Sequence, residues 1–365
     1  MQRRKFIVKA GGALVAATAA ATQVIDAPNV IAQPRFQWRL PHSFPPSADI
    51  LDLGYKRFAK TVDDMSGGRL KIQVFAGGEL IPAFGNFDAC SQGTVEAFAS
   101  ASYYWAGKEP AVQWFCAVPF GLNAQGTYAW YRFGDGLKLW EEVYAPFNLV
   151  PRPGLSTGVQ MGGWFRKKMN TIADYKGLKM RIPGLGGKVI AKAGASVVLL
   201  PGGEIYTALE RGTIDATEWV GPHDDTKFGL HQAARYYYYP GWHEPGTTGE
   251  ITFNRKAYDA LPADLRHILD YAAAAAHTIG LVEYDTKNAI ALQKLRTEFK
   301  AKVEILPFPA ELMKELKKLA LDINREESEK SPAAKKVYAS YQKFEVAVTD
   351  WATLSEQAYH NLIAG

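Results

Sequence analysis

The chain has 365 residues, of which 47% are hydrophobic and 12% aromatic, with 42 Lys and Arg against 37 Asp and Glu. This composition indicates a globular protein with room for two domains, and it excludes an intrinsically disordered chain. Residues 1–32 hold four basic residues and one acidic residue, so the net charge falls from +5 to +2 without them. Such a weakly charged chain lacks the basic character of a nucleic-acid-binding domain, and we expect no nucleic-acid partner.

The first 32 residues have the organisation of an export signal. A basic start with Arg3 and Arg4 precedes an apolar run of small residues at 10–21, and Val30-Ile31-Ala32 offers a cleavage site. The run is shorter than the roughly 20 residues that span a bilayer. The arginine pair predicts export to the periplasm by the twin-arginine route, with a Sec signal as the open alternative. In that compartment Cys90 and Cys116 could pair, but we expect two buried free thiols, because a chain of this size needs no disulfide.

Strand and helix patterns alternate through residues 36–105. Strands are predicted at 36–40, 69–75 and 95–101, with helices at 49–66 and 87–92 between them. This order is typical of a doubly wound α/β lobe. Tyr103 and Tyr104 fall just past the end of its third strand.

A second alternation follows. Strands are predicted at 148–151, 158–165, 177–182, 197–200 (short and buried), 214–219, 236–239 and 302–306, and helices at 189–195 and 203–211. After Pro262 a long helix is predicted to about Lys300, and residues 309–365 are helical with apolar stripes. The fold class is therefore α/β, with two doubly wound lobes, a cleft between them, a long connecting helix and an extended C-terminal helix. We assign 33–155 and 250–275 to lobe I, 156–249 and 276–308 to lobe II, and 309–365 to a dimerisation segment.

Arg181 lies at the end of a predicted strand, directly before Pro183-Gly184. Ligands of open α/β sheets bind beyond the carboxyl ends of strands, and a guanidinium matches a carboxylate with two parallel hydrogen bonds. The alternation around Arg181 also fits a solvent-facing strand position. The pattern alone favours this second interpretation and leaves the first one open.

Several other site classes find no support in the sequence. The glycines around 184–187 lack the spacing of a phosphate-binding loop, because Ile182 and Val189 occupy positions that such a loop needs for Gly and for Ser or Thr. No nucleophile motif or cysteine-cluster spacing is present. His42, His223 and His243 are too far apart in sequence to form a ligand pattern. A periplasmic enzyme is therefore the weaker alternative to a binding protein, and we expect no catalysis.

Three segments, at 174–184, 208–219 and 261–272, make the chain resemble the substrate-binding proteins of TRAP transporters, the DctP-type family. The resemblance covers essentially the whole chain after residue 32, and the arginine before Pro-Gly is its most specific motif. Gln160, the Glu218-Trp219 pair and the extended C-terminal helix are similar to the α-keto-acid-binding branch of the family.

The resemblance implies a periplasmic receptor whose two lobes close on a 2-oxo monocarboxylate such as pyruvate or 2-oxobutyrate. Arg181 would hold the carboxylate, and Gln160, Glu218 and Trp219 would contact the ligand and surround a cation, Trp219 through its backbone carbonyl. Glu244 would be a further metal ligand, and Tyr103 and Tyr104 would contact the substrate from the opposite lobe. The cation would be Na⁺, or Ca²⁺ instead.

Three alternatives stay open under this resemblance. Glu218 could pair with Arg181 without any metal. The ligand could be another carboxylate, either a lactate-type hydroxy acid bound with calcium or a dicarboxylate. The expected partners are the membrane subunits of the transporter and a second copy of the chain, joined through the C-terminal helix, although the apolar stripe would also allow that helix to fold back on its own lobes.

Overall fold

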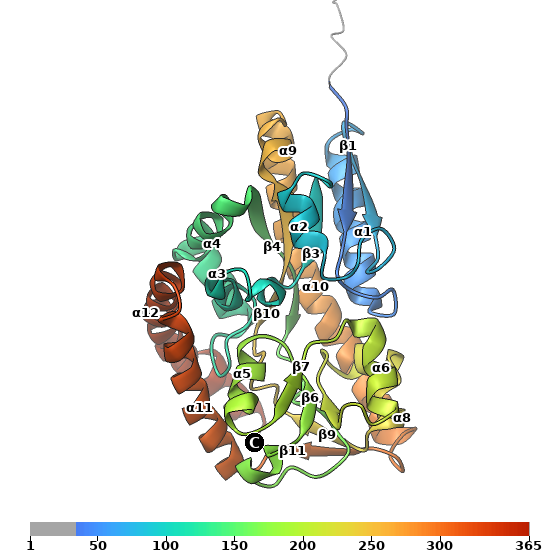
Figure 1. Cartoon of the computed structure of the whole chain (residues 1–365), viewed down its shortest axis with the longest axis vertical. Helices are drawn as coiled ribbons and strands as arrows, with labels where there is room; N and C mark the ends of the chain where they lie inside the picture. Colours follow the sequence, from blue (N-terminus) through green and yellow to red (C-terminus); the bar gives the residue numbers. More distant parts are fainter. Residues whose placement is uncertain (1–33, 365) are drawn as a thin grey trace, which may run out of the picture. The chain divides into compact units, whose positions relative to one another are not determined.

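The computed structural model describes residues 34–364 (Figure 1), so the predicted signal and its cleavage site lie outside the described residues. Five strands form the first sheet region. β1 (Phe36–Pro41) pairs in parallel with β2 (Leu70–Phe75), and β10 (Thr247–Asn254) pairs antiparallel with β3 (Ala97–Ser100) and β4 (Leu149–Gly158). A parallel bridge from His42 to Ala99 links the two groups. A strand from late in the chain, β10, thus lies in the first sheet region between β3 and β4.

The second lobe contains a six-stranded sheet in the order β11-β9-β5-β8-β6-β7. Its strands are β5 (Gly163–Phe165), β6 (Lys179–Arg181), β7 (Ser196–Val198), β8 (Ala216–Thr217), β9 (Tyr236–Tyr239) and β11 (Glu304–Pro307). β6 is parallel to both β7 and β8, and Arg181 is opposite Thr217. The carboxyl ends of β6 and β8 therefore lie side by side, which brings Glu218 next to Arg181.

One long helix connects the two sheets. α10 (Ala263–Thr297) packs on β4, on α1 (Asp49–Met65) and on α7 (Pro222–Lys227), and Figure 1 shows it passing behind both lobes. Its buried positions include several alanines and Gly280, whose missing side chain leaves space for Leu155 of β4. The two-lobe α/β architecture and the long connecting helix are confirmed. The exact lobe boundaries stay predictions.

The remaining helices cover the sheets. They are α2 (Asn86–Ser91), α3 (Ala124–Phe133), α4 (Gly136–Tyr144), α5 (Gly184–Lys192), α6 (Gly202–Glu210), α8 (Leu230–Ala233) and α9 (Arg255–Asp259). A 3₁₀ turn at Ser102–Trp105 holds the two predicted tyrosines. Among residues 34–364, no helix has the length and apolar character needed to cross a membrane.

The chain ends in three helices, α11 (Ala310–Ser328), α12 (Pro332–Leu354) and α13 (Glu356–Ala364). The first half of α12 is anchored, since the Tyr341 hydroxyl accepts a hydrogen bond of 2.7 Å from the Leu122 amide. Beyond this point large apolar side chains are exposed, among them Val346, Trp351 and Leu354. The predicted C-terminal helical segment is confirmed, and its far end leaves an apolar surface without cover from the described residues.

Two strand predictions were wrong. Residues 158–165 do not form one strand: β4 ends at Gly158 and β5 begins at Gly163, and both glycines have positive φ (70° and 114°), which only glycine adopts without strain. β7, predicted to be buried, lies at the sheet edge and is mostly exposed. Helices α3 and α4 were not predicted. Cys90 and Cys116 are both buried and free, as expected.

Candidate functional site

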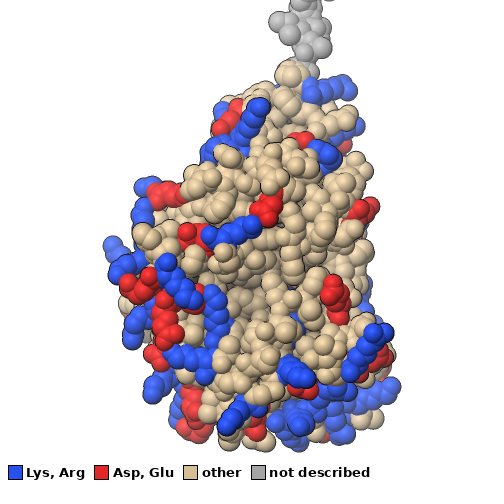
Figure 2. Space-filling view, in the orientation of Figure 1, with Lys and Arg blue, Asp and Glu red and all other residues tan. Residues whose placement is uncertain are grey.

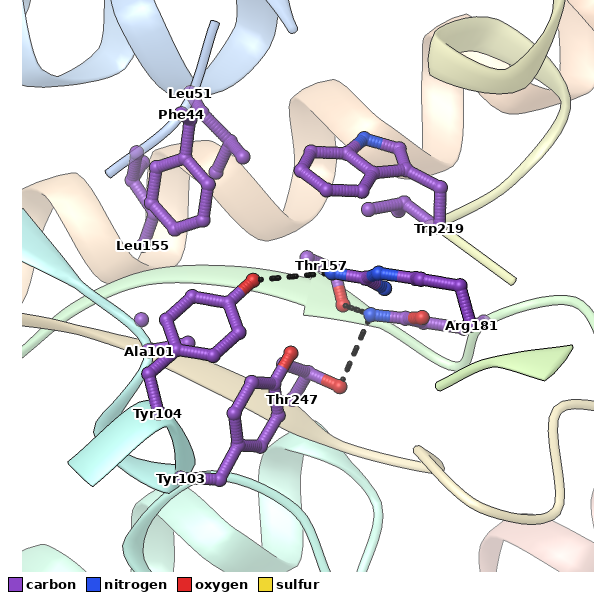
Figure 3. A pocket seen from close by; sticks show the side chains of 13 residues that line it. Phe44, Leu51, Ala101, Tyr103, Tyr104, Leu155, Thr157, Arg181, Trp219 and Thr247 are labelled. Carbon is purple, nitrogen blue, oxygen red and sulfur yellow. Dashed lines mark hydrogen bonds between the residues drawn. The ribbon is translucent and has the colours of Figure 1, made fainter. Parts of the chain in front are cut away.

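A small cavity of about 30 Å³ lies where the two lobes meet (Figure 3). The first-lobe side supplies most of the apolar groups together with Thr157 and Thr247, and the second-lobe side supplies Arg181 and Trp219. The lining residues are Phe44, Leu51, Ala101, Tyr103, Tyr104, Leu155, Thr157, Gln160, Arg181, Trp219, Val220, Thr247 and Gly249. In the orientation of Figure 2, the centre of this face carries few charged side chains.

Arg181 is the central polar group of the cavity and is only 1% exposed. It is the last residue of β6, and its side chain is held from three directions. Nη1 donates to the Glu218 carboxylate, Nε donates to the Leu200 carbonyl at 3.3 Å, and Nη2 donates to the Tyr104 hydroxyl at 3.4 Å. The contact to Tyr104 is long, so the Nη2 edge is the part of the guanidinium that can be offered to a ligand.

The charge of Arg181 is secure despite its burial. Burial by itself lowers the pKa of Arg181, but the neighbouring Glu218 raises it and leaves it above the usual value. Burial raises the pKa of Tyr104 to about 12, although the charge of Arg181 acts in the opposite direction. Tyr104 therefore stays protonated, and its hydroxyl can donate to an anion placed beside Arg181.

Tyr103 and Trp219 supply two further aromatic walls of the cavity. The Tyr103 ring lies over Gly184, where an added Cβ would come within 3.1 Å of the ring and where φ is +60°. Trp219 lies with its ring centroid 5.3 Å from the Arg181 guanidinium, and its Nε1 donates to Asp224 Oδ2 at 3.2 Å. The indole is therefore fixed in orientation while one face covers the arginine.

A chain of hydrogen bonds forms the polar end of the cavity. Gln160 Nε2 donates to Thr157 Oγ1 (3.2 Å) and to Thr247 Oγ1 (3.1 Å), and Thr247 Oγ1 donates to Glu244 Oε2 (2.6 Å). These bonds fix the amide and the carboxylate but leave Gln160 Oε1 and Glu244 Oε1 buried without a hydrogen-bond partner. Unsatisfied buried oxygens are unfavourable, and a cation would satisfy both.

His243 lies next to the polar end of the cavity, a position that the sequence did not predict. Glu218, His243 and Glu244 each offer a donor atom within 4.8 Å of the others, and all three are buried. His243 Nε2 lies 3.4 Å from Glu218 Oε2. Burial raises the pKa of Glu244, and the negative charge of Glu218 raises it further. A bound cation would offset the repulsion between the two carboxylates.

The structure thus brings every predicted site residue to one place. Tyr103, Tyr104, Gln160, Arg181 and Trp219 line the cavity. Glu218 accepts a hydrogen bond from Arg181, and Glu244 is connected to the cavity through its hydrogen bond from Thr247. The Arg181–Glu218 ion pair, which the sequence left open as an alternative, is present.

The apolar side of the cavity was missed. Phe44, Leu51 and Leu155 have no sequence signal that separates a cavity wall from a core position. The three histidines that the sequence discounted as a metal set are indeed apart, since His42 bonds Asp52, His223 bonds Asp49, and His243 lies by Glu218.

Residues 42–330 match the sequence profile of the bacterial extracellular solute-binding protein family 7, DctP. The chain is also 43% identical to a monocarboxylate 2-oxoacid-binding periplasmic protein of Nostoc sp. (strain PCC 7120), over 99% of this chain and 98% of the relative. The chain belongs to this family of TRAP solute-binding proteins. Homologues of this kind are periplasmic receptors, in agreement with the expectation drawn from the three sequence segments.

Three solved structures are similar over 90% of the chain. A TRAP solute-binding protein from Bordetella bronchiseptica, a mixed-occupancy dimer with copurified calcium and picolinate, has a TM-score of 0.88 at 38% identity over 97% of its chain. A TRAP solute-binding protein from Pseudoalteromonas atlantica, with bound sodium and pyruvate, has a TM-score of 0.87 and is 41% identical, over 99% of its chain. Another from Colwellia psychrerythraea, with bound calcium and pyruvate, has a TM-score of 0.86 and is 39% identical, over 99% of its chain.

Proposed function

We propose that this protein is the periplasmic receptor of a TRAP transporter and captures a 2-oxo monocarboxylate, such as pyruvate or 2-oxobutyrate, together with a cation. The observation that carries the proposal is the pairing of a buried arginine edge with two unpartnered buried oxygens across a cavity of about 30 Å³. An anionic carboxylate suits the first feature, and a cation suits the second. The small volume favours a ligand of few carbon atoms.

In this proposal the ligand carboxylate binds Arg181 Nη2 and the Tyr104 hydroxyl. Phe44, Leu51 and Leu155 would face the alkyl end, where an apolar wall favours a methyl or ethyl group over a second carboxylate. That wall is the feature that disfavours the dicarboxylate alternative. Tyr103 and Trp219 would exclude water from the two faces of the ligand.

The residues present fit a cation of the alkali or alkaline-earth type. Gln160 Oε1, Glu244 Oε1, the Glu218 carboxylate and the Trp219 backbone carbonyl would supply the hard oxygen ligands that Na⁺ and Ca²⁺ prefer, and the 2-oxo group would complete the set. We propose Na⁺, with Ca²⁺ as the alternative, since similar proteins carry one or the other with pyruvate. Picolinate in the Bordetella protein supports the same chemistry, because its ring nitrogen and carboxylate can chelate a cation as a 2-oxo acid does.

The membrane subunits would recognise the closed conformation of the two lobes, which forms when the ligand binds. Arg181 belongs to the second sheet and Tyr104 follows β3 of the first, so a carboxylate held by both stabilises the closed arrangement over an open one. Export by the twin-arginine signal and formation of a homodimer through the C-terminal helices belong to the same proposal. The exposed apolar end of that segment supports the homodimer. Catalysis has no part in it.

The test is a titration of the protein with pyruvate, 2-oxobutyrate, lactate and malonate, in chelator-treated buffer with and without Na⁺ or Ca²⁺. Tryptophan fluorescence reports on Trp219, and a ligand present at 100 times its Kd should stabilise the fold by about 2.7 kcal/mol. We expect saturable binding of the two 2-oxo acids, a dependence on the cation, and loss of binding in Arg181→Ala. Arg39→Ala, at an exposed arginine on β1, is the matched control. Binding of lactate or malonate in preference to pyruvate would overturn the 2-oxo acid assignment.

A further inference from the structure

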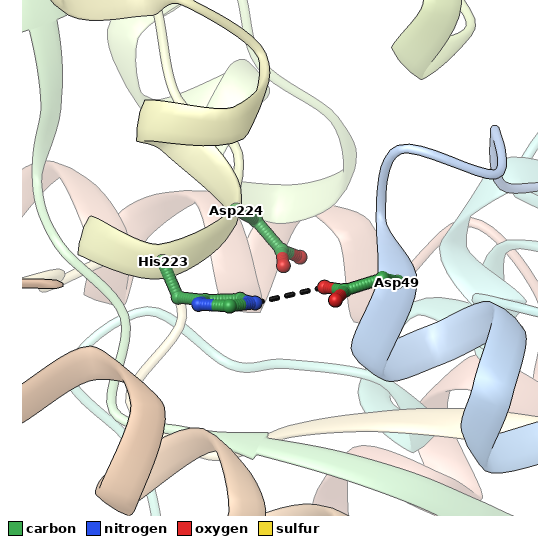
Figure 4. Close-up of side chains that lie close together, drawn as sticks. All are labelled: Asp49, His223 and Asp224. Carbon is green, nitrogen blue, oxygen red and sulfur yellow. Dashed lines mark hydrogen bonds and ion pairs between the residues drawn. The ribbon is translucent and has the colours of Figure 1, made fainter. Parts of the chain in front are cut away.

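A second cluster of potential metal ligands lies outside the cavity, between α1 and α7 (Figure 4). It consists of Asp49, His223 and Asp224, whose donor atoms all lie within 4.8 Å of one another. His223 Nε2 is 2.8 Å from Asp49 Oδ1, and the Asp224 carboxylate points toward both groups in Figure 4. No other function described above uses these three side chains as a set.

One carboxylate oxygen of the cluster has no hydrogen-bond partner within residues 34–364. Asp224 is 0% exposed, and its Oδ2 accepts hydrogen bonds from Tyr284 (2.9 Å) and Trp219 (3.2 Å). Its Oδ1 has no hydrogen-bond partner among the described residues. A buried carboxylate oxygen left without a partner is strongly unfavourable, and Asp49 adds a second negative charge next to it. Both features call for a positive charge between the two carboxylates.

We propose that Asp49, His223 and Asp224 bind a divalent transition-metal ion, with Zn²⁺ as the best match. One imidazole nitrogen and two carboxylates form a ligand set that zinc accepts with a fourth position open to water. Tetrahedral zinc separates its ligand atoms by about 3.3 Å, so the 2.8 Å contact between His223 and Asp49 needs only a small opening.

Lys227 opposes the binding of a cation at this cluster. Its ammonium binds Asp49 through Oδ2, the other oxygen of that carboxylate, so Oδ1 remains available to the metal. The positive charge of Lys227 nevertheless weakens the attraction for a second cation. This predicts that removal of the charge strengthens metal binding, which a purely structural role of the cluster does not predict.

The position of the site links it to the movement of the lobes. Asp49 begins α1, which packs on β2 of the first lobe, whereas α7 follows β8 of the second. A metal held by both helices favours the closed arrangement. Asp224 also orients Trp219 in the cavity, so metal binding and ligand binding should each strengthen the other. This coupling rests on the proposed function, but the metal site itself does not.

The experiment measures Zn²⁺ binding to the full chain without a histidine tag, by competition with a chromogenic chelator and by equilibrium dialysis with metal analysis. We expect Asp49→Asn and His223→Gln each to weaken binding at least about tenfold, as loss of one ligand does. Lys227→Met should strengthen it. His267→Gln, at an exposed histidine of α10, is the matched control and should change nothing.

A further variant separates this site from the cavity. His243→Gln alters the cluster of Glu218, His243 and Glu244. The His243→Gln variant must still bind one zinc ion, and that binding must depend on His223. The proposal is overturned if the chain binds no zinc, if His223→Gln and Asp49→Asn bind it as the unaltered chain does, or if His243→Gln alone abolishes binding. Circular dichroism checks the fold of each variant. Pyruvate titrations with and without Zn²⁺ then test the coupling. Pyruvate affinity that does not change with zinc would count against the coupling, and absence of any pyruvate binding would count against the receptor assignment, whereas neither outcome bears on the metal site.

Discussion

Arg181 and Glu218 form a buried ion pair although 37 residues separate them in the chain. The pair exists because β6 and β8 are parallel neighbours and each residue lies at the carboxyl end of its strand. Both side chains are 1% exposed, so neither charge is solvated. The pair thus holds the arginine in place. The Glu218 carboxylate also supplies one of the oxygen ligands that we assign to the cation.

Removal of the arginine alone should destabilise the protein strongly. Arg181→Met leaves Glu218 as a buried charge without a partner, which typically costs about 3–5 kcal/mol of the free energy of unfolding. The double variant Arg181→Met/Glu218→Met should recover most of this loss and still bind no 2-oxo acid. Urea unfolding measures the stability. As a control, Arg39→Met removes an exposed ion pair with Glu96 and should cost less than about 1 kcal/mol. A double variant no more stable than the single one would contradict the explanation.

The cation requirement should depend on the charge of Glu244. Glu244→Gln keeps an oxygen for Thr247 but removes the negative charge, so we expect the affinity for Na⁺ or Ca²⁺ to fall at least about tenfold. Because burial and Glu218 raise the pKa of Glu244, protons compete with the cation at a higher pH than for an ordinary glutamate. Cation affinity of the unaltered chain should therefore fall between pH 8 and pH 6. Calorimetric titration at both pH values checks this, and an equally steep fall in Glu244→Gln would assign the effect to another group.

The fold was largely predictable because its signals are local. The alternation of apolar residues around Arg181 and the Pro-Gly break after it mark a strand end, and the residues after Pro262 have the length of a connecting helix. Local signals failed where a strand boundary depends on how the strands pair in the sheet. Residues 158–165 were predicted as one strand, but the chain turns at Gly158 and Gly163, whose φ angles are positive, so β4 ends at the first and β5 begins at the second.

The candidate site was predictable in part for the same reason. Arg181 and the Glu218-Trp219 pair lie in segments that resemble a family, so their positions followed from the resemblance. His243 escaped because its closeness to Glu218 depends on the packing of a loop against β8, which no spacing encodes. Leu51 and Leu155 escaped because an apolar residue that lines a cavity has the same periodicity as one that fills a core.

Glu250 should make stability depend on pH. It is fully buried on β10, accepts hydrogen bonds from Trp105 and Thr252, and its burial raises its pKa from 4.5 to about 7. Between these values the folded protein keeps a proton that the unfolded chain has released, so the free energy of unfolding falls as the pH rises from about 4.5 to 7. The shift corresponds to a loss of about 3 kcal/mol.

Glu250→Gln isolates this contribution, because glutamine does not titrate. Asp224 and Asp225 also have pKa values raised by burial, and they contribute the same background to both proteins. We therefore expect a clearly flatter dependence of the unfolding midpoint on pH between 5 and 8 in the variant. Parallel curves for the two proteins would mean that Glu250 keeps an ordinary pKa.

The proposed homodimer should be held together by the C-terminal helices. Trp351 and Leu354 are 69% and 73% exposed in the single chain, and side chains of this size are typical centres of protein interfaces. Trp351→Glu places a charge at such a centre and should weaken dimerisation by at least about 2 kcal/mol, or roughly thirtyfold in Kd. Light scattering over a dilution series measures the change. Tyr271→Glu, at a 64% exposed aromatic residue of α10, is the matched control and should leave the dimer intact. Because Trp351 lies far along α12 from the anchoring Tyr341, the Trp351→Glu monomer should keep its affinity for 2-oxo acids, and a loss of that affinity would mean that the second copy helps to form the cavity.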